Sequence, residues 1–125
     1  MEVLRERLDV RRRVTEEVRE WAYRLRLRSS VALVGSYARG DFNLWSDVDV
    51  VIVSDEFRGN PVERLKSIDT PPGFEVIPLT LQEFGELLRR GNPIAVELVG
   101  SGVIVRDDYN IRDYIKDQAR PHRPT

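Results

Sequence analysis

Hydrophobic residues near the beginning of the chain recur at spacings of three and four, the repeat of one face of an α-helix. Arg and Glu occupy most positions between them, as on the exposed side of an amphipathic helix. We therefore predict a helix over residues 2–28, in which Trp21 packs in the core. The apolar face of this helix is formed by Leu4, Leu8, Val14, Val18, Trp21 and Leu25.

Short apolar runs further along the chain predict β-strands at residues 31–34, 46–53, 74–79 and 103–106. The second run is apolar at consecutive positions after Asp49, which is typical of a central strand covered on both faces. Pro78 lies in the third run and cannot donate a main-chain hydrogen bond, so this strand is expected near a sheet edge or bend.

Cap and turn residues predict helices between these strands. Pro61 begins a short helix to about residue 67, and Thr80 is the N-cap of a helix that ends at Arg90 with Gly91 in a left-handed cap. Residues 92–102 and 111–118 form two more helices, and one helical turn is expected directly after the first strand. This order predicts an α/β or α+β fold, with a small mixed sheet of about four strands flanked by helices.

Length and composition fit one domain. The chain has 125 residues, of which 41% are hydrophobic and 33% charged. We predict a single domain over residues 1–118, with its core at 30–106 and a disordered tail at 119–125. No apolar run approaches the roughly 20 residues of a spanning helix, and no secretory signal is recognised, so a cytoplasmic location without a membrane partner is expected.

Composition also excludes several kinds of site. The chain has no Cys and one His, His122, which excludes disulfides, thiolate metal sites and clusters of His ligands. The net charge of −1 gives no overall basic footprint, so direct binding of nucleic acid is not expected. The run Arg11-Arg12-Arg13 is either a solvated helix face or a surface for a partner.

Two carboxylates interrupt the second predicted strand. Asp47 and Asp49 are two positions apart, so their side chains point the same way with about 7 Å between the Cα atoms. Converging carboxylates repel each other unless a cation lies between them. Oxygen ligands without His or Cys favour hard cations, chiefly Mg²⁺ and also Mn²⁺. We interpret both aspartates as metal ligands.

A turn of small residues precedes this strand. Gly35 and Ser36 end the first predicted strand and offer main-chain N–H groups and a hydroxyl. Because Gly35 has no Cβ, a phosphate can approach the main chain closely. Mg²⁺ commonly completes its shell with phosphate oxygens. The turn and the carboxylates together predict a site for a nucleoside triphosphate and its metal.

The stretch GSYARGDFNLWSDVDVVIV resembles the core motif of the DNA polymerase β-like nucleotidyltransferase superfamily. The motif has a Gly-Ser pair, here Gly35-Ser36, a spacer, here residues 37–46, and an Asp-x-Asp pair, here Asp47 to Asp49, before an apolar strand. Ala38-Arg39-Gly40 and the Ser before the first Asp make it most similar to the minimal nucleotidyltransferases. These small prokaryotic proteins are usually encoded beside a helical HEPN-domain protein. The resemblance covers residues 15–106.

The resemblance implies a third carboxylate on a neighbouring strand. Glu75, on the third predicted strand, is the candidate, and Asp69 is the alternative. Asp47 and Asp49 would hold two Mg²⁺ ions, with Mn²⁺ as a substitute. Glu75 would help to hold the catalytic metal and would orient or deprotonate the acceptor hydroxyl.

The resemblance also implies phosphate-binding residues. Gly35 and Ser36 would bind the β- and γ-phosphates. Arg39 either adds positive charge at the leaving group or pairs with Asp41 to brace the turn, and both interpretations stay open. Ser46 is expected to form a hydrogen bond at the strand entry beside the nucleotide.

Larger members of the superfamily carry added domains that bind the acceptor. The resemblance therefore implies a partner in trans, a HEPN-domain protein, in a hetero-oligomer. In such pairs the nucleotidyltransferase is the antitoxin, and some members transfer AMP from ATP onto a tyrosine of the toxin. We expect that reaction here. Two alternatives stay open: an antitoxin that binds its partner without turnover, and a catalytic subunit that acts on RNA or a small molecule.

Overall fold

The computed structural model describes residues 2–119 and contains a four-stranded mixed sheet in the order β3-β2-β1-β4. β1 is antiparallel to both of its neighbours, whereas β2 and β3 run parallel. The strands are β1 (Ser30–Val34), β2 (Val48–Val53), β3 (Phe74–Leu79) and β4 (Val103–Asp107). This is the predicted α+β architecture, and β2 has the predicted central position.

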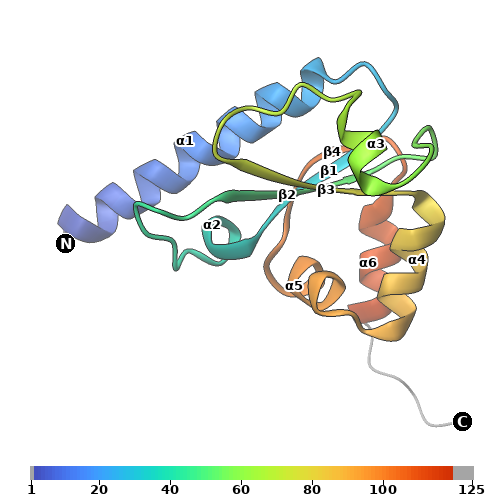
Figure 1. Cartoon of the computed structure of the whole chain (residues 1–125). Helices are drawn as coiled ribbons and strands as arrows, with labels where there is room; N and C mark the ends of the chain where they lie inside the picture. Colours follow the sequence, from blue (N-terminus) through green and yellow to red (C-terminus); the bar gives the residue numbers. More distant parts are fainter. Residues whose placement is uncertain (1, 120–125) are drawn as a thin grey trace, which may run out of the picture.

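Helices cover both faces of the sheet (Figure 1). The long helix α1 lies on one face, and α4, α5 and α6 lie on the other, with the N-terminal end of α1 extending beyond the sheet. The helices are α1 (Glu2–Arg24), α2 (Gly35–Arg39), α3 (Pro61–Leu65), α4 (Leu81–Arg90), α5 (Pro93–Ser101) and α6 (Ile111–Ala119). Within residues 2–119, no helix has both the length and the apolar composition needed to cross a membrane.

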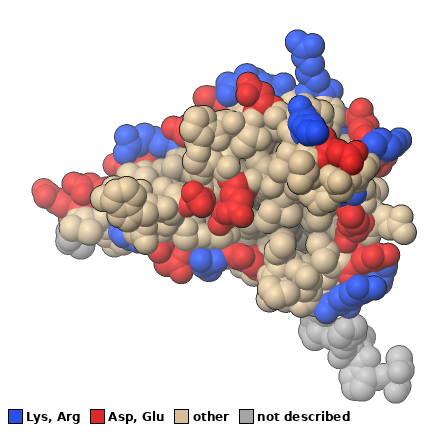
Figure 2. Space-filling view, in the orientation of Figure 1, with Lys and Arg blue, Asp and Glu red and all other residues tan. Residues whose placement is uncertain are grey.

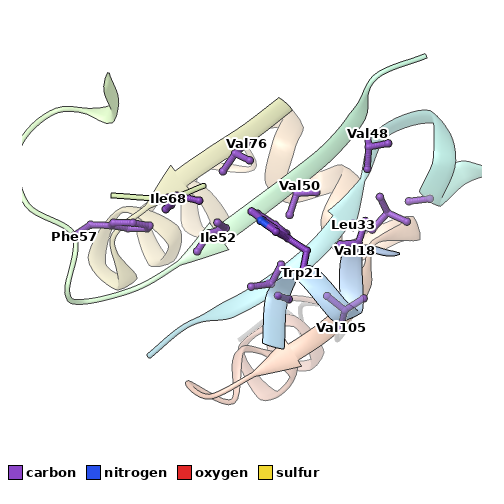
Figure 3. Close-up of a cluster of buried hydrophobic side chains, with 13 residues drawn as sticks. Val18, Trp21, Leu33, Val48, Val50, Ile52, Phe57, Ile68, Val76 and Val105 are labelled. Carbon is purple, nitrogen blue, oxygen red and sulfur yellow. The ribbon is translucent and has the colours of Figure 1, made fainter. Parts of the chain in front are cut away.

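Each face of the sheet buries its own hydrophobic cluster. The α1 side contains Trp21, which lies among side chains of the sheet in Figure 3 and is only 4% exposed. Its ring meets that of Phe74 edge-on at 5.3 Å between centroids. On the other side, Val51 and Val53 of β2 pack with residues of α4, α5 and α6. Because β2 is buried by both layers, its apolar run has no polar face.

Local signals place α4 and β3 as predicted. Thr80 and Glu83 form a reciprocal capping box at the beginning of α4, and Gly91 ends the helix at φ 62°. β3 is an edge strand, which accommodates Pro78 because the missing N–H is not needed for a second neighbour. The predictions for the core position of Trp21 and for these element types are confirmed.

The predicted end of the first helix is wrong, since α1 ends at Arg24 instead of residue 28. Arg106 of β4 explains the early end. Its guanidinium donates to the carbonyl oxygens of Ala22 at 2.7 Å, Leu25 at 2.9 Å and Leu27 at 3.1 Å. These carbonyls are satisfied by a distant side chain, so the chain leaves the helix without a local Gly or Pro signal.

Other boundaries differ from the predictions by one or two residues, and β1 and β4 are each one residue longer than expected. β2 begins at Val48 instead of residue 46, and α3 ends at Leu65 instead of residue 67. The predicted tail at 119–125 lies outside the described residues except for Ala119, with which α6 ends. The single-domain span of residues 1–118 and the cytoplasmic location stay predictions.

Candidate functional site

The parallel pairing of β2 and β3 brings two of the predicted carboxylates together. Asp49 of β2 is the register partner of Glu75 on β3. Asp47 lies immediately before β2, whose first residue, Val48, donates its N–H to Gly73 O at 2.8 Å. Asp49 is half-buried, whereas Asp47 and Glu75 are exposed. The acidic group therefore lies at the rim of the sheet, open to solvent.

Burial and neighbouring carboxylates make ionisation of Asp49 unfavourable. Burial raises the pKa of Asp49 to about 6, and the charge of Glu75 and a hydrogen bond with it contribute next. The charges of Asp47 and of Glu97 raise this pKa further. Glu97 lies on α5, so a fourth carboxylate faces the same position from another element. A cation bound here would relieve this repulsion.

The donor chemistry of this group fits a hard divalent ion, because carboxylate oxygens are the ligands that Mg²⁺ and Mn²⁺ prefer. The side chains are not, however, arranged as a closed coordination shell. Within residues 2–119, no three Asp, Glu, His or Cys side chains converge closely enough to hold one ion. The structure thus brings together Asp49 and Glu75 but does not preform the predicted ligand set.

Gly35 lies directly against this acidic group. It begins α2 at φ 75°, and a Cβ built on it would lie 2.2 Å from Oδ2 of Asp49. The position thus requires glycine twice, for its backbone conformation and for the close approach. The N-cap of α2 is Val34, which offers no side-chain hydrogen bond to the first turn. Main-chain N–H groups beside Asp49 are consequently left without a local side-chain cap.

Ser36 and Ser46 have different local roles. Ser36 is half-buried in α2, and its main-chain oxygen accepts hydrogen bonds from the N–H groups of Gly40 at 2.8 Å and Asp41 at 3.1 Å. The hydroxyl of Ser46 instead accepts from the N–H of Asn43 at 2.9 Å. Ser46 thus closes the turn that precedes Asp47, which agrees with the expected hydrogen bond at the strand entry.

Arg39 forms ion pairs with two carboxylates. Its Nε lies 3.2 Å from Oδ2 of Asp41, and a second nitrogen pairs with Glu97. These partners raise the pKa of Arg39, with the hydrogen bond to Asp41 as the largest cause. The interpretation in which Arg39 braces the turn through Asp41 therefore agrees with the structure. The contact with Glu97 was missed, because nothing in the local sequence around residue 97 marks it.

The alternative third carboxylate lies elsewhere. Asp69 is exposed on the segment between α3 and β3, where its main-chain oxygen accepts a hydrogen bond from Nε1 of Trp21 at 2.9 Å. A cavity of about 750 Å³ is lined there by residues of the C-terminal end of α1 and of this segment. Asp69 therefore belongs to the α1 side, whereas Glu75 is paired in register with Asp49.

The turn before Asp47 presents two apolar side chains to solvent. Leu44 is 95% exposed and Trp45 is 89% exposed. The side-chain oxygen of Asn43 accepts a hydrogen bond from the N–H of Trp45 at 2.8 Å, which helps to hold the turn that exposes these side chains.

Figure 2 shows acidic side chains in the middle of the face viewed, at the level of the sheet, with largely uncharged surface around them.

Comparison with known proteins identifies one family. Residues 11–124 match the model of a family described as "Nucleotidyltransferase domain". The match spans Gly35 and Ser36, Asp47, Asp49 and Glu75. None of the curated proteins and none of the solved structures compared with the chain matches it.

Proposed function

The chain belongs to the nucleotidyltransferase domain family, and on this premise we propose that it transfers AMP from ATP onto a hydroxyl of a partner protein. The proposed acceptor is a tyrosine of a HEPN-domain toxin, for which this chain would be the antitoxin. The observation that carries the proposal is the contact of Gly35 with the carboxylate of Asp49, which pairs in register with Glu75. Phosphate-binding main chain and acidic ligands thus meet at one place.

In the proposed reaction, the acceptor oxygen forms a bond to the α-phosphorus of ATP. The bond from this phosphorus to the bridging oxygen breaks, and pyrophosphate leaves with that electron pair. Glu75, which is exposed at the rim, accepts the proton of the acceptor hydroxyl. Gly35 and Ser36 hold the β- and γ-phosphates and so keep the leaving group in line with the attacking oxygen.

Asp47, Asp49 and Glu75 would hold Mg²⁺, which, when bound, supplies positive charge to the phosphate oxygens. The raised pKa of Asp49 supports this ligand set. Burial and the charges of Glu75, Asp47 and Glu97 make ionisation of Asp49 unfavourable, and a bound cation would relieve this repulsion. Arg39 stays paired with Asp41 and Glu97 and braces the end of α2.

The surface beside the carboxylates supports a protein as acceptor. Leu44 and Trp45 are almost fully exposed on a hydrogen-bonded turn. Exposed Trp is typical of protein interfaces, where it contributes much of the binding energy. The net charge of −1 gives no overall basic footprint for a nucleic-acid acceptor.

One observation favours a second candidate function, an antitoxin that binds its partner without turnover. Within residues 2–119, the carboxylates are not arranged as a closed metal site. A protein of this kind would use the Leu44–Trp45 turn for binding and would need neither Asp47 nor Asp49.

The test combines the protein with α-labelled ATP, Mg²⁺ and the product of the neighbouring gene. Label on the partner, lost when its acceptor tyrosine is replaced by Phe, supports the proposal. A stable complex without label supports the binding role, and label only on RNA or a small molecule supports the remaining alternative. Asp47→Asn is the matched inactive variant, because Asp47 is exposed and its replacement leaves the core intact.

A further inference from the structure

The side chain of Arg11 in α1 forms hydrogen bonds to the C-terminal end of α2. Its Nε donates to the main-chain oxygen of Tyr37 at 2.9 Å, and its Nη2 donates to that of Ala38 at 2.8 Å. Both bonds are partly buried and join residues 26 and 27 positions apart in the chain. One guanidinium therefore satisfies two consecutive carbonyls of the short helix that begins with Gly35.

Arg7, one turn earlier in α1, holds the segment that follows. Its Nη2 donates to Phe42 O at 2.7 Å and to Gly40 O at 3.3 Å. Its guanidinium also lies over the Phe42 ring, 4.8 Å from the centroid, and this ring stacks on Tyr37 at 4.5 Å. Two arginines of α1 thus hold both α2 and the segment that follows it.

α2 needs such support because it has only five residues. A helix of this length is not stable alone, and the last carbonyls of any helix have no intrahelical partner. A positive charge at these carbonyls also interacts favourably with the negative end of the helix. At its other end α2 has no side-chain N-cap and lies against Asp49. The position of Gly35 and Ser36 therefore depends on anchoring at the C-terminal end.

We propose that Arg11 is a positioning residue for nucleotide binding: its two hydrogen bonds to α2 keep Gly35 and Ser36 in place beside Asp49. This inference rests on the proposed function, since it assumes that the nucleotide phosphates bind at that turn. Arg11 itself does not touch the nucleotide and acts through Tyr37 and Ala38.

Arg13 and a conservative replacement of Arg11 provide matched controls. Arg13 is exposed, and within residues 2–119 its side chain forms no hydrogen bond or ion pair. Arg11 is half-buried by comparison. Arg13→Ala thus removes the same charge from the same helix without touching α2. Arg11→Lys keeps the charge but cannot bind two carbonyls with a fork of donors.

The experiment measures binding of Mg²⁺–ATP to the full chain by titration calorimetry. Loss of two charge-assisted hydrogen bonds is expected to weaken binding by about tenfold in Arg11→Ala, with Arg11→Lys intermediate and Arg13→Ala unchanged. In the transfer assay, the KM for ATP should rise by a similar factor, while kcat changes less. Hydrogen exchange without nucleotide gives a second readout. The amides of Gly40 and Asp41, which donate to Ser36 O, should exchange about tenfold faster in Arg11→Ala alone.

The outcomes separate this proposal from the proposed function. If wild-type protein binds Mg²⁺–ATP and Arg11→Ala binds it equally well, the positioning role is overturned and the proposed function stands. An equal loss in Arg13→Ala would also overturn it, because general attraction by the charges of α1 would then explain the effect. If wild-type protein binds no nucleotide, the proposed function fails and this role for Arg11 fails with it. Should Arg11→Ala not fold, Arg11→Lys carries the same comparison.

Discussion

The main chain of Gly35 lies against the carboxylate of Asp49, so closely that a methyl group on Gly35 would be 2.2 Å from Oδ2. This contact joins the beginning of α2 to the beginning of β2. It explains why position 35 cannot carry a side chain while Asp49 keeps its present position. Any side chain at position 35 would push Asp49 away from the main chain that we propose to bind the phosphates.

Gly35→Ala is therefore expected to destabilise the protein and to abolish nucleotide binding. The free energy of unfolding should fall by about 3 kcal/mol, from backbone strain at positive φ and from the clash with Asp49. Gly40→Ala is the control, because Gly40 also has a positive φ, 93°, but a Cβ there meets nothing within 4 Å. It should cost only about 1 kcal/mol and preserve nucleotide binding. Equal behaviour of the two variants in denaturation and titration would show that the contact with Asp49 is unimportant.

Asp49→Asn is expected to stabilise the metal-free protein at pH 7. The folded-state pKa of Asp49 is raised from 3.8 to about 6, so ionisation above pH 6 costs folding free energy. As the pH falls from 6 towards 4, Asp49 takes up a proton in the folded state only, and the wild type regains this stability. The Asn variant should be more stable by about 1 kcal/mol at pH 7, after allowance for solvent screening, and the difference should shrink by pH 4.5.

Thermal denaturation at both pH values checks this prediction. Added Mg²⁺ should reverse the order at pH 7, because the ion binds the ionised carboxylate of the wild type and stabilises its folded state. An Asn variant that is less stable than the wild type at pH 7 without metal would contradict the crowding of carboxylates around Asp49.

Glu75→Gln is expected to reduce nucleotidyl transfer by at least about a hundredfold, because it removes the proposed proton acceptor beside Asp49. Asp69→Asn should leave transfer unchanged, since this carboxylate lies on the segment that contacts Trp21. The assay is incorporation of α-labelled AMP into the partner protein. The opposite result, activity lost in Asp69→Asn and kept in Glu75→Gln, would reassign the third carboxylate.

Trp45→Ala is expected to impair recognition of the partner protein and nothing else. Trp45 is 89% exposed, so its removal should leave the free energy of unfolding and the affinity for Mg²⁺–ATP unchanged. Partner affinity should fall by on the order of tenfold. Tyr23→Ala, an aromatic that is 65% exposed on α1, is the matched control and should bind the partner normally. A pull-down with quantified Kd distinguishes the two, and normal binding by Trp45→Ala would remove the turn from the interface.

Local interactions explain why so much of the fold follows from the sequence. The capping box of Thr80 and Glu83 and the left-handed Gly91 lie within a few positions of the helix they delimit. The apolar periodicity of α1 indicates that one face of this helix is buried. The consecutive apolar residues of β2 indicate that both faces of this strand are buried. The spacing of Asp47 and Asp49 likewise needs no knowledge of the rest of the chain.

Other features depend on partners that are distant in the sequence. Arg106 ends α1 from 84 positions away, and Glu97 meets Arg39 across 58. Arg11 appeared as one of three equivalent arginines until its contacts with α2 distinguished it. Sequence periodicity fixes which face of an element is buried, but the register of parallel strands and the packing of helices determine which polar groups then meet.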